Sequence, residues 1–287
     1  MRRWTGGKAL VSITFSDLED FQFMTAELNK VEGPKRMKCD VEAMIVSFAI
    51  EPYDTKMCYR ISQCLARCVS STYEKRWMEQ LLESTYYFQD QDEIAEISAI
   101  ARSIGDGNKD DIPGASRYSN RRDLLLEAAI SCIEQGGTIS FDSFLRFRTG
   151  PYRALLATLI GEAIDEYKLE QEYQNFVQAL RLLLKSRESV TKRVILVFDG
   201  SYRLYNATGN VLTSNQDLKF EELPKGLSVD DIDPEILLPL LVTAPEEIYL
   251  YTDHNEEGLA QTIQNVFEER LYFFPYRMSK ILFSGNH

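Results

Sequence analysis

Residues 150–185 of this chain read GPYRALLATLIGEAIDEYKLEQEYQNFVQALRLLLK. Gly150 and Pro151 open the stretch, and proline is favoured in the first turn of a helix. Apolar residues then recur with the spacing of one helix face, and the glycine at position 161 is a weak point that a long helix tolerates. The sequence therefore predicts one long helix that forms the spine of its domain. Its apolar positions are Tyr152, Leu155, Leu156, Leu159, Ile160, Ala163, Tyr167, Tyr173, Phe176, Val177, Leu180, Leu183 and Leu184.

The residues upstream of this helix begin with alternating strand and helix patterns. A polar, turn-rich segment at 105–114 follows and has the composition of a linker or a mobile loop. Beyond it, a helix capped by Ser119 or Asn120 is expected to stop at Gly136-Gly137. The expected elements of the first third are a strand at 8–15, a helix at 16–31, a strand near 41–50, a long helix at about 54–83 and a short helix at 91–103.

The last hundred residues return to strand patterns separated by turns. Asp199-Gly200 is typical of a hairpin turn. The expected elements are strands at 194–198, 202–205 and 210–213, a helix at 234–243, a strand at 247–251 and a helix at about 256–270.

These patterns predict an α+β fold with three regions. An N-terminal strand-helix-strand-helix layer occupies 1–110, and a central helical section with the long helix occupies 111–189. A C-terminal small mixed sheet with helices occupies 190–287.

Composition excludes several classes of protein. The 287 residues include 32 basic and 44 acidic side chains, which give a net charge of −12. A molecule of that charge is repelled by nucleic acid and by anionic membrane surfaces, so neither partner is expected.

The N-terminus imitates a signal peptide, because Arg2, Arg3 and Lys8 precede a short apolar run. Acidic residues follow that run at once, and no small-residue cleavage site appears, so a first strand is the favoured interpretation. No apolar run approaches the roughly 18 residues that a membrane span needs. A cytoplasmic protein without membrane insertion is expected.

Five cysteines are present, and Cys58, Cys64 and Cys68 suggest a metal cluster at first sight. On a helix, however, Cys64 and Cys68 fall on one apolar stripe with Met57, Ile61, Leu65 and Val69. Free cysteine commonly packs as a small buried hydrophobe. No pair has the spacing of a zinc site. Core packing is therefore favoured over a metal site, and no metal or cofactor is expected.

No phosphate-binding loop, dinucleotide fingerprint or hydrolase motif occurs in the chain. Of the two histidines, His287 is the terminal residue, whereas His254 follows a predicted strand beside Asp253. Ligand sites gather at the carboxyl ends of strands in α/β sheets, so Asp253 and His254 form a possible strand-end site. The favoured alternative is that Asp253 or Asn255 caps the next helix while His254 lies in solvent.

Two further acidic segments are explained without catalysis. Asp230, Asp231 and Asp233 precede Pro234, where carboxylates suit a helix N-terminus better than a magnesium site. Residues 246–270 include seven acidic residues but only one arginine. This segment predicts an acidic face suited to a basic protein partner.

One segment is basic, although the chain as a whole is acidic. Arg146, Arg148 and Arg153 lie around the start of the long helix, together with Tyr152. Backbone N–H groups at a helix start favour an anion, which arginines could clamp. Pairing with carboxylates elsewhere in the fold is favoured over binding of an anion or a partner, but these four residues are the candidate binding patch.

The same segment carries a family resemblance. Phe144-x-Arg146-Phe-Arg148-x-x-x-Tyr152, followed by Glu170-Gln-Glu-Tyr173-x-x-Phe176-Val177-x-x-Leu180, resembles the YtxC-like family of sporulation proteins. The likeness continues through the strand at 194–198, Tyr202-Arg-Leu-Tyr205 and Ile263-Gln-Asn-Val-Phe267-Glu-x-Arg270. It covers about 119–275, and the first third of the chain fits only in outline. Tyr272-Phe-Phe-Pro275 departs from the family pattern.

The resemblance implies a cytoplasmic protein of spore-forming bacteria without an established biochemical activity. It supplies no catalytic residues, and Arg146, Arg148 and Tyr152 match its motif. The expected function is a role in sporulation through an unidentified protein partner, without catalysis. The alternative is an enzyme or sensor that binds a small phosphorylated ligand, in which Arg146, Arg148 and Arg153 would converge on one concave site.

Overall fold

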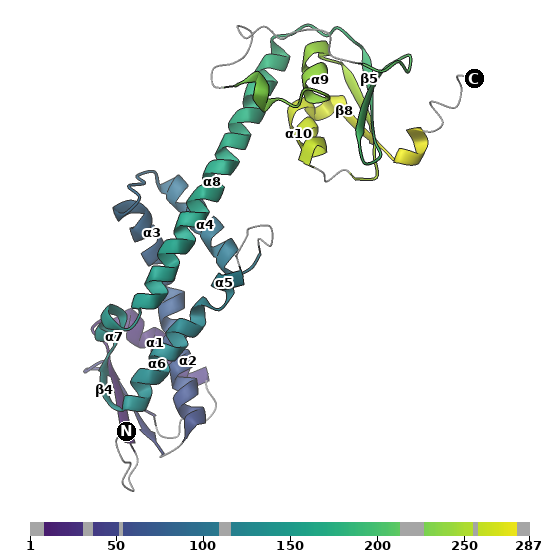
Figure 1. The fold of residues 1–287 in the computed structure, drawn as a ribbon. Coiled ribbons are helices and arrows are strands. Elements are labelled where there is room, and N and C mark those ends of the chain that lie inside the picture. The colour runs from purple at the N-terminus through teal and green to yellow at the C-terminus, as the bar shows by residue number, and fades with distance from the viewer. Residues whose placement is uncertain are drawn as a thin grey trace. The chain divides into compact units, whose positions relative to one another are not determined.

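The chain forms two compact units, Met1–Lys168 (unit 1) and Leu169–His287 (unit 2). Each unit has its own hydrophobic core, and helix α8 (Gly150–Lys185) supplies residues to both cores (Figure 1). The predicted α+β class, with a small sheet in each terminal region and one long helix, is confirmed. The structure, a computed structural model, describes residues 9–30, 37–51, 54–108, 116–212, 227–254 and 258–279.

The contacts divide the chain differently from its composition, which suggested regions 1–110, 111–189 and 190–287. Tyr118, Leu125, Ala129 and Phe141 come from the central region, yet they lie in the same core as the N-terminal strands and helices. The helices before α8 therefore complete unit 1.

Unit 1 places a four-stranded sheet beside a group of helices. The strand order is β2-β3-β1-β4, with β1 antiparallel to β3 and parallel to β4. Helices α2 and α6 pack side by side (Figure 1). In chain order the elements are β1 (Ala9–Thr14), α1 (Leu18–Lys30), β2 (Met37–Asp40), β3 (Ile45–Ile50), α2 (Thr55–Thr72), α3 (Glu74–Ser84), α4 (Gln91–Gly105), α5 (Ser116–Ser119), α6 (Arg121–Gln135), β4 (Gly137–Ser140), α7 (Phe141–Phe147) and the N-terminal part of α8.

Two predicted elements of unit 1 are divided in the structure. The segment near 41–50 contains a turn at 41–44 followed by β3, which forms a hairpin with β2. The helix expected at 54–83 is broken at Tyr73, after three hydroxyl-bearing residues with low helix propensity. The break allows the Tyr73 hydroxyl to donate a hydrogen bond to Asp20.

Strand β4 was not predicted. It consists of four residues and pairs with β1, so that Ile13 lies opposite Ile139. Four residues are too few to display an alternating pattern, and the partner strand lies far away in the sequence.

Unit 2 contains a second four-stranded sheet, with the order β6-β5-β7-β8. Strands β5, β7 and β8 are parallel, and β6 is antiparallel to β5. The β5–β6 connection contains Gly200 with φ of 99°, as the predicted hairpin turn requires. The elements are the C-terminal part of α8, β5 (Arg193–Phe198), β6 (Tyr202–Asn206), η2 (Val229–Asp231), α9 (Leu237–Thr243), β7 (Glu247–Tyr251), α10 (Gly258–Phe267), η3 (Glu268–Arg270), β8 (Leu271–Phe274) and η4 (Tyr276–Met278).

The two faces of this sheet differ. Val194, Leu196, Ile248 and Leu250 are buried in one core with residues of α8, α9 and α10. Aromatic side chains cover the opposite face, where the guanidinium carbon of Arg193 lies 4.3 Å from the centroid of the Tyr249 ring. The strand expected at 210–213 is reduced to a bridge between Tyr205 and Val211, and position 213 lies outside the described residues.

The cysteines of α2 lie where the apolar stripe predicts. Cys64 and Cys68 are buried in the core of unit 1. Burial raises the pKa of the Cys64 thiol to about 11 and that of Cys68 to about 12. Both side chains are therefore neutral thiols at neutral pH and act as packing residues.

The buried carboxyl group of Asp20 predicts a pH dependence of stability. Burial raises its pKa, although the Tyr73 hydroxyl donates a hydrogen bond to it and opposes the rise. Because the pKa in the folded state exceeds that in the unfolded state, this group stabilises the fold at low pH. That stabilisation is lost as the pH rises through the folded-state pKa.

Urea unfolding of wild type and Asp20→Asn at several pH values between 4 and 7 measures this effect. The free energy of unfolding of wild type should rise relative to Asp20→Asn as the pH falls, by about 1.4 kcal/mol for each unit of pKa difference. A relative decrease at low pH would show that the folded state lowers this pKa.

Candidate functional site

The arginine-rich segment forms the end of α7 and the start of α8 (Figure 1). Helix α7 begins after Ser140, whose hydroxyl accepts a hydrogen bond from the Ser143 N–H at 3.3 Å. Phe141 and Phe144 are buried and hold the helix against unit 1. The helix therefore turns its last residues outward.

Three consecutive side chains at this end form an exposed surface, which we name the Arg–Phe corner: Arg146, Phe147 and Arg148. The Phe147 side chain is 70% exposed. The guanidinium carbon of Arg146 lies 5.3 Å from the centroid of its ring, a cation–π contact. Arg148 and Phe147 line a hollow of about 320 Å³, which is completed by residues of α6 and β4.

Arg153 lies in a different hollow. Its guanidinium carbon is 5.2 Å from the centroid of the Trp77 ring, and both side chains line a hollow of about 400 Å³ between α3 and α8. Arg146 lines neither this hollow nor the one beside Arg148. Arg146 thus stacks on Phe147, and Arg148 lines one hollow with Phe147, whereas Arg153 lines another.

The three arginines do not pair with carboxylates of the described residues. The sequence favoured such pairing over binding. Instead Arg146 and Arg153 stack on aromatic rings, and all three side chains are exposed. Their charges are available to a partner.

Tyr152, the fourth candidate of this patch, is 1% exposed and belongs to a buried polar network. Its hydroxyl donates a hydrogen bond to the Glu74 carboxylate. The same carboxylate accepts from Arg121 Nη2 at 3.0 Å, and Arg121 also donates to Asp106 at 2.8 Å. Burial, together with the neighbouring Glu74 charge, raises the pKa of Tyr152 well above its usual range. Tyr152 thus fixes the start of α8 to α3.

Sequence reasoning missed the Arg121–Glu74–Tyr152 network. Arg121 and Arg122 are adjacent at the start of α6, a pattern typical of a solvated helix end. Only Arg121 is buried, with a side chain 2% exposed against 62% for Arg122. No sequence signal separates the two.

The strand-end candidates lie at the carboxyl edge of the parallel strands in unit 2. The Asp253 carboxylate accepts a hydrogen bond from the Tyr276 N–H at 3.2 Å, and the Tyr276 hydroxyl donates to Asp199 at 3.1 Å. Arg203 also pairs with Asp199. His254 is exposed. The carboxylates at this edge therefore join the strand ends to one another.

The other acidic segments are largely engaged in structural contacts. Asp233 accepts hydrogen bonds from the N–H groups of Ile236 and Leu237 at the start of α9, as capping predicts. In the predicted acidic face, Glu247 pairs with Arg193 and Glu268 with Arg181. Residues 255–257 of that face lie outside the described residues, as does His287.

Among the described residues, no group of three or more His, Cys, Asp or Glu side chains could hold a metal ion. Within the ranges that the structure describes, none of the helices has the length and apolar character needed to cross a membrane.

Comparison with known proteins identifies the family. A model of the YtxC-like family matches residues 59–272, which extends the likeness beyond the expected 119–275 toward the N-terminus. The chain is 39% identical over 206 residues to the uncharacterised protein YtxC of Bacillus subtilis (strain 168), over 70% of this chain and 72% of that protein. No solved structure matches. The chain belongs to the YtxC-like family.

Proposed function

We propose that this protein acts in the cytoplasm during sporulation by binding another protein, without catalysis, and that the Arg–Phe corner is its contact surface. The observation that supports this proposal is the exposure of three consecutive side chains, Arg146, Phe147 and Arg148, with neither arginine paired to a described carboxylate. Arginine and aromatic residues are enriched in protein interfaces, where they dominate the binding energy. The link to sporulation rests on the family resemblance.

The rival function, binding of a small phosphorylated ligand, needs several guanidinium groups around one concave site. Arg148 and Arg153 line different hollows. This separation favours a contact surface over a clamp for a phosphate group.

Affinity capture from sporulating cells tests the proposal with the Arg146→Glu/Arg148→Glu variant. A partner retained by wild type should be lost, because two charges at the contact are reversed. With purified partner, loss of hot-spot contacts worth about 2 kcal/mol should weaken binding about 30-fold. Circular dichroism should show that the variant remains folded.

Lys75→Glu/Arg76→Glu is the matched control, since it reverses the same number of charges on exposed side chains of α3 in the same unit. It should retain the partner. Equal loss of binding in both variants would indicate a general charge effect and contradict the assignment to the Arg–Phe corner. Failure to capture any specific partner with wild type would contradict the proposed function itself.

A further inference from the structure

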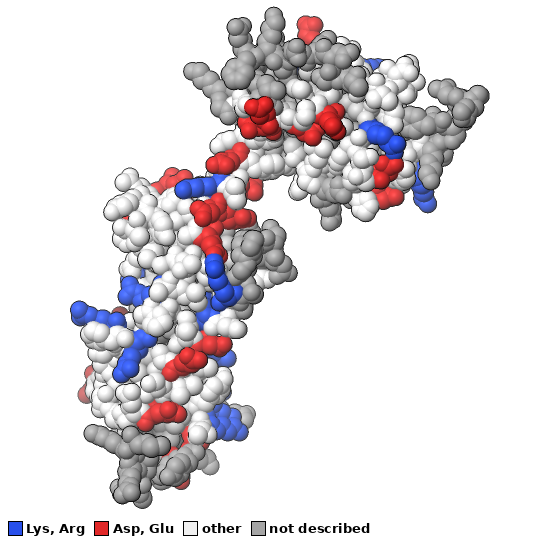
Figure 2. Space-filling view, viewed as in Figure 1, with Lys and Arg blue, Asp and Glu red and all other residues white. Residues whose placement is uncertain are grey.

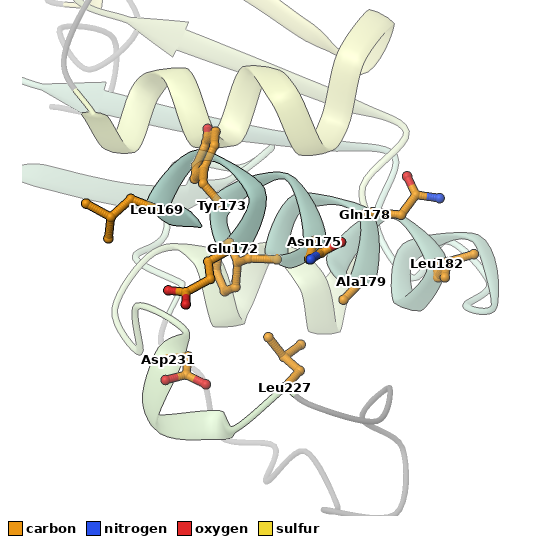
Figure 3. A pocket seen from close by; sticks show the side chains of 10 residues that line it. Leu169, Glu172, Tyr173, Asn175, Gln178, Ala179, Leu182, Leu227 and Asp231 are labelled. Carbon is orange, nitrogen blue, oxygen red and sulfur yellow. The ribbon is translucent and has the colours of Figure 1, made fainter. Parts of the chain in front are cut away.

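Unit 2 carries a groove of about 890 Å³ along the C-terminal half of α8 (Figure 3). One wall is α8, and the other is formed by Leu227 and by Asp231 of η2. The groove lies wholly within unit 2. Its lining residues are Leu169, Glu172, Tyr173, Asn175, Phe176, Gln178, Ala179, Leu182, Leu227 and Asp231.

The α8 wall presents an apolar stripe to this groove. Leu169, Phe176 and Ala179 recur at spacings of seven and three residues, which place them on one helix face, and Leu182 follows Ala179 three residues later. Leu169 is 63% exposed and Leu182 is 52% exposed, and they mark the two ends of the stripe. At 1.5 Å per residue the stripe is about 20 Å long, which matches a helix of about four turns.

The charged side chains of the lining are acidic. Glu172 on α8 and Asp231 on η2 lie on opposite sides of the groove at the same end (Figure 3), and among the described residues that line the groove there is no lysine or arginine. Figure 2 shows several acidic side chains along the exposed middle part of α8, with a basic side chain among them. An apolar stripe with carboxylates on both sides complements a partner of opposite charge.

We propose that this groove binds an amphipathic helix of a partner protein, with apolar residues on one face and lysine or arginine along its margins. Helices dock in this way by placing side chains at i, i+3, i+4 and i+7 into an apolar groove. A second copy of this chain is the poorer occupant, because its net charge of −12 opposes approach to an acidic rim. The groove is separate from the Arg–Phe corner, and the proposal does not depend on that surface.

Fluorescence anisotropy with two labelled peptides of about 14 residues tests the proposal. Both peptides carry leucine on one helix face, and the remaining positions are lysine in the first and glutamate in the second. The Leu–Lys peptide should bind wild type at least tenfold more tightly than the Leu–Glu peptide. Leu182→Glu should weaken its binding at least tenfold.

Val190→Glu is the control for the apolar contact, since Val190 is 73% exposed in unit 2 and outside the groove. Both substitutions add one negative charge, which by itself favours a cationic peptide. Weakening by Leu182→Glu alone therefore reports lost apolar contact. Equal affinity of Leu182→Glu and Val190→Glu for the Leu–Lys peptide would overturn the proposal.

Glu172→Lys and Glu170→Lys test the charge. Both side chains are exposed on α8, but only Glu172 lines the groove. Glu172→Lys should weaken Leu–Lys binding at least fivefold more than Glu170→Lys. Equal weakening would show non-specific attraction and overturn the proposal, as would sedimentation of wild type as a dimer that Leu182→Glu converts to a monomer.

Discussion

Replacement of Arg121 by methionine is expected to lower the free energy of unfolding by about 3–5 kcal/mol, because it leaves a buried carboxylate without its counter-charge. The side chains of Arg121 and Glu74 are 2% and 7% exposed. Arg121 also donates hydrogen bonds to Asp106 and to the Gly105 carbonyl. These contacts join α3, α4 and α6, and Tyr152 adds α8 through Glu74. Urea unfolding monitored by circular dichroism measures this decrease in the free energy of unfolding.

Arg122→Met is the matched control. Arg122 is the neighbouring residue, its side chain is 62% exposed, and its nearest carboxylate oxygen lies 3.7 Å away on Asp106. An exposed pair of this kind contributes at most about 1 kcal/mol. An Arg121→Met variant as stable as Arg122→Met would contradict the role of the network.

A triple variant separates buried charge from packing. In Glu74→Leu/Arg121→Met/Tyr152→Phe, the buried charges and the hydroxyl are removed together, while Asp106 keeps its partial exposure of 44%. Replacement of a whole buried ion pair by apolar groups of similar volume often leaves the free energy of unfolding nearly unchanged. The triple variant should therefore recover most of the stability lost in Arg121→Met.

The spacing of apolar residues predicted the helices and strands that can be recognised without knowledge of the segments they pack against. The apolar stripe of 150–185 gave α8, and the apolar run after Arg193 gave β5. Strands β4 and β8 have four residues each, and their pairing with β1 and β7 defines them. Such short strands carry too little local signal to be read from one sequence.

The candidate site was predictable in part. The excess of arginine before α8 identified Arg146 and Arg148, which are exposed at the end of α7. The same pattern could not show that Tyr152 faces Glu74 or that Arg153 stacks on Trp77. Both partners lie in α3, and contacts between distant segments leave no trace in the spacing of one segment.

The continuity of the α8 stripe also concealed that its two ends serve different cores. Leu159 and Leu180 are both 0% exposed, but Leu159 belongs to the core of unit 1 and Leu180 to that of unit 2. Leu159→Ala and Leu180→Ala should each lower stability by about 2–5 kcal/mol, because each leaves a cavity in a packed core. Each loss should be confined to its own unit.

Hydrogen exchange followed by mass spectrometry locates each loss. Leu159→Ala should accelerate exchange in β1 and β3 and leave β5 and β7 unchanged, while Leu180→Ala should do the reverse. Gln178→Ala, an exposed position on the same helix, should change neither set. Acceleration in both sheets by either core variant would mean that the units unfold together. Local unfolding free energies follow cooperative units of structure, so one uninterrupted helix can belong to two such units. The apolar pattern along a single helix therefore does not reveal where one core ends and the next begins.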